Sequence, residues 1–175
     1  MGFGGRLVTD AVKVDFALQG AGWADCRLEV GLSVLEMNGV SYCTDALGDL
    51  VRVAALIAAG HHAGALSFDG EPREWRWILE RHWSDDLKGV EPGLRVRIFG
   101  FSDISRHAPE TEGHLEFEAV CDPDAFALAV ERMARSLRDA LGADGYAEAW
   151  GGAPFPERAL AGLKAVLGLP VETTA

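Results

Sequence analysis

Residues 71–83, EPREWRWILERHW, are the stretch that decides the fold. Read at the two-residue period of a β-strand, Trp75, Trp77 and Trp83 point to one side. The opposite side carries polar residues and one isoleucine: Glu74, Arg76, Ile78, Glu80 and His82. A helical reading scatters the tryptophans around the axis, and aromatic residues fit a pleated, half-buried surface. The stretch therefore predicts a strand with one aromatic face.

This strand is preceded by turn chemistry. Residues 69–72 read DGEP, in which glycine tolerates a positive φ and proline fixes φ. An apolar run, residues 64–68, lies before the turn, so the two segments predict a β-hairpin. The tryptophan face has two interpretations, the floor of the core or a stacking platform for a ligand. We favour the core, because large apolar side chains on one strand face are mostly packing.

Alternating residues also predict strands near the N-terminus. Residues 7–18 alternate apolar and polar side chains, and a glycine-rich turn at 20–22 leads into a second run, residues 25–34. In that run Leu28, Val30, Leu32 and Val34 share one predicted face. Asn38 and Gly39 predict a hairpin turn, followed by a short returning strand at residues 40–42.

Helical signals alternate with further strand signals. Thr44 or Asp45 is expected to cap a helix that ends at Gly60. Residues 94–101 and 114–121 alternate as strands. Asp122 is expected to cap a second helix that ends at Gly142. A short helical turn at residues 145–150 and a last helix from residue 156 to 168 complete the pattern.

The order of strands, helix, strands and helices predicts an α+β fold. We expect an antiparallel sheet of about six strands covered by helices, with a C-terminal helical segment. Residues 1–170 form a single α+β domain in this reading, and residues 171–175 are a tail that frays.

Composition excludes several classes of partner. The 175 residues carry 16 Lys and Arg against 27 Asp and Glu, a formal charge of −11. A nucleic-acid binder needs a basic stripe, and an anionic membrane surface attracts basic segments, so neither partner is expected. Three widely spaced cysteines and no recognisable signal segment predict a cytoplasmic protein with reduced thiols.

Two segments offer candidate ligand-binding or partner-binding residues. The aperiodic loop 102–113 contains Asp103, Arg106 and His107, and long loops are often functional. We weigh an acid–base pair of Asp103 and His107, a partner-binding loop, and a plain flexible connection, which we favour. Tyr146 and Trp150 suit either an interface or the attachment of the last helix to the core, and we prefer attachment.

Cys43, His61 and His62 are weaker candidates. A thiol just before a helix is favoured as a thiolate, although a small buried residue is the simpler reading of Cys43. His61 and His62 are adjacent and lack the spacing of metal ligands, so they are weak metal candidates. We predict no metal site and no cofactor.

Three functional hypotheses remain. The first is a non-catalytic protein-binding domain, of the immunity or regulatory kind, steered by its acidity to a basic protein partner. The alternative is a small-molecule-binding protein or enzyme with a pocket between sheet and helices, using Cys43, His61, His62, Asp103 or His107. The third is a homo-oligomer, such as a dimer, that buries a sheet edge or the tryptophan face.

Overall fold

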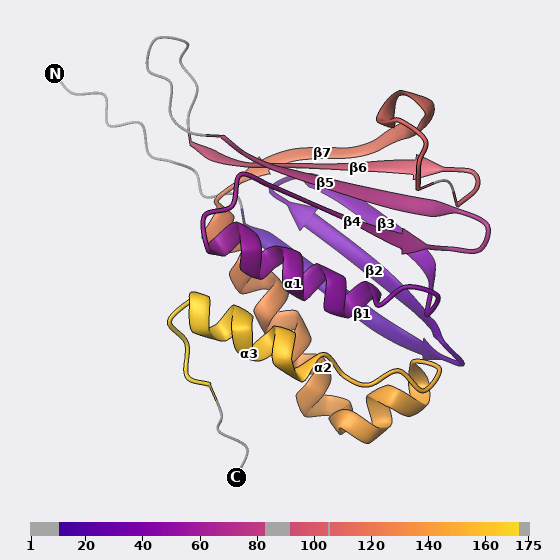
Figure 1. The fold of residues 1–175 in the computed structure, drawn as a ribbon, viewed down its shortest axis with the longest axis vertical. Coiled ribbons are helices and arrows are strands. Elements are labelled where there is room, and N and C mark those ends of the chain that lie inside the picture. Colours follow the sequence, from indigo (N-terminus) through magenta and orange to yellow (C-terminus); the bar gives the residue numbers. More distant parts are fainter. Residues whose placement is uncertain (1–10, 83–91, 105, 172–175) are drawn as a thin grey trace, which may run out of the picture.

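A computed structural model describes residues 11–82, 92–104 and 106–171, and it shows an α+β fold in which runs of strands are followed by helices (Figure 1). Trp83, the first ten residues and most of the predicted tail lie outside this part. The elements in chain order are β1 (Val12–Gly20), β2 (Trp23–Val30), β3 (Ser33–Ser41), α1 (Ala46–Ala58), β4 (Ala63–Asp69), β5 (Glu74–His82), β6 (Gly93–Phe101), the 3-10 turn η1 (Glu110–Glu112), β7 (His114–Cys121), α2 (Pro123–Ala149) and α3 (Glu157–Val166).

The strands form two antiparallel sheets, which corrects the expectation of one sheet of about six strands. Sheet A has the order β1-β2-β3 and sheet B the order β4-β5-β6-β7 (Figure 1). Helix α1 connects β3 to β4, and β3 packs against β4 and β7 without pairing with either. Period two located strands along the chain, with wrong bounds for β3, but it cannot tell which apolar faces share a sheet and which pack face to face.

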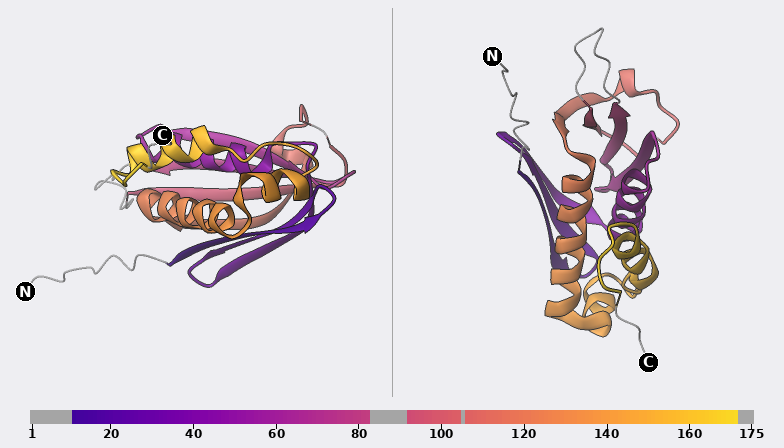
Figure 2. Two further views of the ribbon diagram at one scale, coloured as in Figure 1. Left: turned by 90° about the horizontal axis from the view of Figure 1, so that it is seen from below. Right: turned by 90° about the vertical axis from the view of Figure 1, so that its left-hand side faces the viewer.

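Helix α2 lies between sheet A and the helices α1 and α3, and its buried residues complete the core. Figure 2 shows it passing between sheet A on one side and α1 with α3 on the other, in agreement with its contacts to β1, α1 and α3. The inner faces of both sheets and these helices form one hydrophobic cluster.

The turn between β2 and β3 lies earlier than the sequence predicted. Val30 pairs with Ser33, so Gly31 and Leu32 form a two-residue hairpin loop. Such a loop reverses which residues face inward, because directly paired residues share a face. Leu32 and Val34 therefore point outward, 103% and 47% exposed, although they continue the alternation of the preceding strand.

The Asn38–Gly39 pair is a bulge inside β3 instead of a turn. The register shifts between Ala24 and Asp25 of β2, and the Gly39 N–H donates to Asp25 Oδ1 at 2.9 Å. Gly39 has a φ of 78°, which glycine adopts without strain. A bulge restores the original facing, so Val40 points into the core opposite Ala24.

The helix ends agree with the sequence. The Asp45 carboxylate accepts from Gly48 N at 3.3 Å, and the Asp122 carboxylate accepts from Ala125 N at 2.8 Å, so both residues are N-caps. Gly142 interrupts α2 with a φ of 68°, which divides it into the predicted helix and the predicted short segment. None of the helices in the described ranges is long and apolar enough to cross a membrane.

Candidate functional site

The tryptophan side of β5 is part of the core. Trp75 and Trp77 are 4% and 0% exposed, and the Trp77 ring centroid lies 5.3 Å from that of Phe68. Tyr146 and Trp150 are also fully buried, where they attach the end of α2 to β1 through Phe16. These four candidate binding residues therefore have packing roles, and Trp83 lies outside the described residues.

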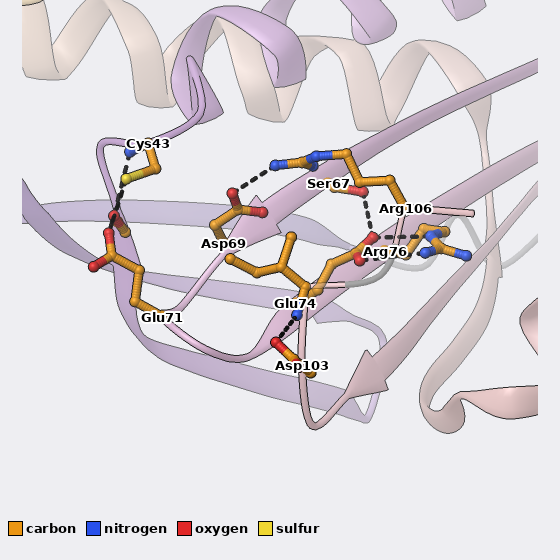
Figure 3. A network of polar contacts seen from close by, with 10 residues as sticks. Cys43, Ser67, Asp69, Glu71, Glu74, Arg76, Asp103 and Arg106 are labelled. Carbon is orange, nitrogen blue, oxygen red and sulfur yellow. Dashed lines mark hydrogen bonds and ion pairs between the residues drawn. The ribbon is translucent and has the colours of Figure 1, made fainter. Parts of the chain in front are cut away.

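The opposite side of sheet B carries a polar network, which we call the polar face. It consists of Ser67, Asp69, Glu74, Arg76 and Arg97. In the register of the sheet, Asp69 pairs with Glu74 and Ser67 pairs with Arg76, so four of these side chains form two adjacent cross-strand pairs. The close view in Figure 3 shows this arrangement. The outward positions of β5 thus supply Glu74 and Arg76, while β4 supplies Ser67 and Asp69 and β6 supplies Arg97.

Glu74 is the buried centre of the polar face. Its carboxylate is fully shielded from solvent and accepts from Ser67 Oγ at 2.8 Å and from Arg76 Nε at 2.9 Å. Arg76 also donates to the carbonyl oxygen of Ala108 at 2.5 Å and lies 4.3 Å from the centre of the Phe101 ring. A buried carboxylate needs such charged partners, because an unpaired one is strongly unfavourable.

Asp69 is the second buried carboxylate. Its Oδ2 accepts from Arg106 Nη2 at 2.5 Å, whereas its Oδ1 is buried and has no hydrogen-bond partner. Burial raises the pKa of Asp69, the Arg106 guanidinium lowers it, and the neighbouring carboxylates of Glu74 and Glu71 raise it further. The buried Asp69 Oδ1 therefore lacks a hydrogen-bond donor, and the carboxylates of Glu74 and Glu71 lie near it.

The loop after β6 folds back over the polar face. Phe99 and Phe101 are 8% and 6% exposed although they lie outside the main core cluster. A Cβ on Gly113 would come within 2.6 Å of the Phe101 ring, and Arg97 Nη1 donates to Glu110 Oε2 at 3.0 Å. The described part of residues 102–113 thus contacts the polar face through Arg106, Ala108 and Glu110, and the flexible connection that we favoured stays a prediction.

A smaller cluster lies at the start of α1. Cys43 Sγ donates to Glu71 Oε1 at 2.9 Å, and Ser41 Oγ donates to the same oxygen (Figure 3). These hydrogen bonds lower the pKa of Glu71, that from Cys43 contributing most. Cys43 is exposed and not the small buried residue that we favoured. A nucleophilic cysteine is activated by a neighbouring cation, whereas the partner of Cys43 is a carboxylate.

The remaining candidates are dispersed. Cys43 precedes α1 and His61 follows it, so a helix of 13 residues separates them by about 20 Å. Asp103 accepts from Ile104 N at 2.8 Å, and His107 is exposed. Among the described residues no group of three or more His, Cys, Asp or Glu side chains is arranged to hold a metal ion.

Two cavities in the described part of the chain do not bring these candidates together either. A groove of about 750 Å³ lies between β1 and α2, and a hollow of about 260 Å³ lies between α2 and α3. Neither is lined by Cys43, His61, His62, Asp103 or His107. The alternative hypothesis required several of these residues in one pocket, and this arrangement gives it no support.

Sequence reasoning found Arg106 but missed its partner. Asp69 was read only as part of a turn, and Glu74 only as the outward side of β5. The available signal was the period-two pattern itself, which put Glu74 beside Arg76 on one face. We found no match to this chain among protein-family models, curated proteins or solved structures.

Proposed function

We propose that this protein is a non-catalytic binding protein, of the immunity or regulatory kind, that holds a basic protein partner. The proposed contact surface is the acidic patch, defined as Glu71, Asp103 and Glu112. All three side chains are exposed and lie at one end of sheet B. That end is shared because Glu74 pairs with Phe101 and Gly100 pairs with His114, so the β4–β5 turn and the β6–β7 connection leave sheet B together.

The observation that carries this proposal is an imbalance of pairing. The arginines near this end already have carboxylate partners: Arg73 with Glu116, Arg76 with Glu74, Arg97 with Glu80 and Glu110, and Arg106 with Asp69. The three carboxylates of the acidic patch have no cationic partner among the described residues. The arginines near this end are therefore already paired, whereas the carboxylates of the acidic patch are not paired with a cation among the described residues.

One further feature fits a cationic partner. Hydrogen bonds from Cys43 and Ser41 lower the pKa of Glu71, which keeps its carboxylate ionised over a wider pH range. An acidic surface also accelerates the encounter with a basic partner, in a way that salt screens.

The test is a pull-down from source lysate at low and at high salt, with mass spectrometry of the bound proteins. The wild type is compared with the patch variant Glu71→Gln/Asp103→Asn/Glu112→Gln. The matched control, Asp139→Asn/Asp144→Asn/Glu148→Gln, removes the same formal charge from exposed positions of α2. We expect a stoichiometric basic protein that is retained by the wild type and the control, and released by salt or by the patch variant.

Two results would overturn the proposal. One is a partner that the patch variant binds as well as the wild type does. The other is the absence of any salt-sensitive basic protein, with all three chains folded by circular dichroism. Because the substituted side chains are exposed, we expect little change in stability, within about 0.5 kcal/mol for each substitution.

A further inference from the structure

The free edge of β1 is the second feature of the molecule that a partner can use. Among the described residues, β1 of sheet A pairs with β2 alone, and its other edge borders the groove of about 750 Å³. β1 is nine residues long and contains no proline. Edge strands of this length are usually protected, because their unpaired backbone groups are a template for another strand.

The backbone groups that face the groove can be identified. Gly31 N donates to Ala11 O at 3.1 Å, so the backbone of Ala11 is directed toward β2. Backbone direction alternates along a strand, and Lys13, Asp15 and Ala17 are therefore directed the same way as Ala11. The N–H and C=O groups of the alternate residues, Val12, Val14 and Phe16, are directed to the free edge.

We propose that this edge pairs with β1 of a second copy of the chain, antiparallel and centred on Val14. Val14 then pairs with Val14 of the second copy, and Val12 pairs with Phe16 of the second copy. All of these residues direct their backbone groups to the edge, so the hydrogen bonds are geometrically consistent. The product is one continuous sheet across a two-fold axis, which is the usual symmetry of a homodimer.

Charge complementarity selects this register over its neighbours. On the exposed side of β1, the Val14-centred register sets Lys13 opposite Asp15 of the second copy, and by symmetry Asp15 opposite Lys13 of the second copy. A shift by two residues toward the C-terminus sets Asp15 opposite itself, and a shift toward the N-terminus sets Lys13 opposite itself. Directly opposed like charges are destabilising, whereas opposite charges are favourable.

The walls of the groove suit a second copy as well. The α2 residues that line it include Ala125, Ala129, Ser136 and Ala140, whose small side chains permit close approach of another helix. The charged residues of the groove are Lys13, Asp15 and Arg132, so this surface is not acidic although the whole chain carries −11. This surface therefore adds little to the repulsion between two acidic chains.

The first experiment is sedimentation equilibrium of the full chain from micromolar to submillimolar concentration. We expect a reversible dimer with twice the chain mass of 18.7 kDa. Asp15→Lys places lysines opposite one another and should raise the dimer dissociation constant at least about tenfold. The double variant Lys13→Asp/Asp15→Lys restores opposite charges and should restore the dimer. Glu148→Lys, with the same charge change at an exposed position of α2, is the control.

Mixing two single variants sharpens this test. Lys13→Asp carries acids at both positions and Asp15→Lys carries lysines at both, so each should be monomeric alone and the mixture should form a heterodimer. A wild-type chain that stays monomeric overturns the proposal, as does a dimer that Asp15→Lys leaves unchanged. Binding of an extended peptide to a monomeric chain would assign the groove to another occupant and would also overturn it.

The register has its own experiment. Lys13→Cys and Asp15→Cys are each made with Cys43→Ser, which removes the exposed native thiol. Positions 13 and 15 of the second copy are directly opposed, at Cβ separations of roughly 4.5–5.5 Å. Mild oxidation should therefore cross-link the mixture and leave each single variant uncrosslinked. Cross-linking of one variant with itself, and not of the mixture, overturns the Val14-centred register. This inference does not depend on the proposed basic partner.

Discussion

The two faces of sheet B are built from alternate residues of the same strands, and they are held by different physics. The inner face presents Trp75 and Trp77 to a core that spans both sheets. The outer face presents Glu74 and Arg76 to a covering loop from a distant part of the chain. Apolar burial is non-directional and tolerates many neighbours, whereas a buried carboxylate needs particular donors at particular distances.

This difference separates what a single strand determines from what the whole chain determines. The aromatic face needs only an apolar surface opposite it, and Phe68 of the neighbouring strand supplies part of that surface. The polar face also needs two hydrogen bonds with the loop after β6. Arg106 donates to Asp69, and the carbonyl oxygen of Ala108 accepts from Arg76. We therefore expect truncation of a buried ring on the inner face to lower the free energy of unfolding strongly. On the outer face, we expect the effect to depend on whether a buried charge is left without its partner.

The largest expected effect comes from the inner face. Trp77→Ala removes a fully buried ring and should lower the free energy of unfolding by about 3–5 kcal/mol. The neighbouring Ile78→Ala acts on the outer face at a partly exposed position and should cost about 1 kcal/mol. Both are measured by denaturant unfolding with far-UV circular dichroism. Equal losses would contradict the division between the two faces.

On the outer face, the buried ion pair should matter far more than the exposed one. Glu74→Ala leaves the Arg76 guanidinium, whose side chain is 12% exposed, without this carboxylate and should cost about 3 kcal/mol. Glu118→Ala breaks the ion pair with Arg95, in which the side chains are 40% and 39% exposed, and should cost less than about 0.5 kcal/mol. Similar unfolding midpoints for the two variants would show that burial does not govern this face.

A smaller effect is expected at Asp122, which lies between β7 of sheet B and α2. The Asp122 carboxylate caps α2 by accepting from Ala125 N at 2.8 Å, and Asp122→Ala should cost about 1 kcal/mol. Asp122 belongs to neither face of sheet B, so the stability lost in Asp122→Ala is a reference for the losses in the other variants. Asp122→Asn retains a capping side chain and should be nearly neutral. A melting curve unchanged in Asp122→Ala would show that the cap contributes nothing.

The course of the chain could be predicted where local pattern decides it. Alternation identified the strands other than β3, and Asp45, Asp122 and Gly142 marked helix ends as expected. The alternation failed at residues 31–34, because a two-residue loop reverses the facing of the chain and Val34 continued the pattern on the wrong side. The division into two sheets was also out of reach, since it depends on where α1 directs the chain.

The candidate site could be predicted only in part. Arg106 was a candidate from its place in a long loop, and its partner Asp69 lies 37 residues away in the chain. Their meeting requires the order β4-β5-β6-β7 and a loop that folds back, neither of which has a local signature. Sequence pattern therefore supplied the charges of the polar face and not their partners.

The last prediction uses pH to compare the two carboxylates that flank this end of sheet B. Burial raises the pKa of Asp69 in the folded protein above its ordinary value of 3.8, so ionisation of this group opposes folding. Its contribution to stability should decline as pH rises from 3.8 through the raised pKa, and Asp69→Asn should remove that decline. Hydrogen bonds lower the pKa of Glu71 below 4.5, so its contribution is present above 4.5 and is lost as pH falls through the lowered pKa.

Unfolding free energies of Asp69→Asn and Glu71→Gln, measured against the wild type from acid to neutral pH, should therefore change in opposite directions. Arg106→Gln provides the matched check, because Arg106 is the cation that lowers the pKa of Asp69. Without it, the decline attributed to Asp69 should extend to higher pH. If the two carboxamide variants changed in the same direction, the folded-state pKa of Asp69 would lie below 3.8, and the attraction of Arg106 would outweigh burial.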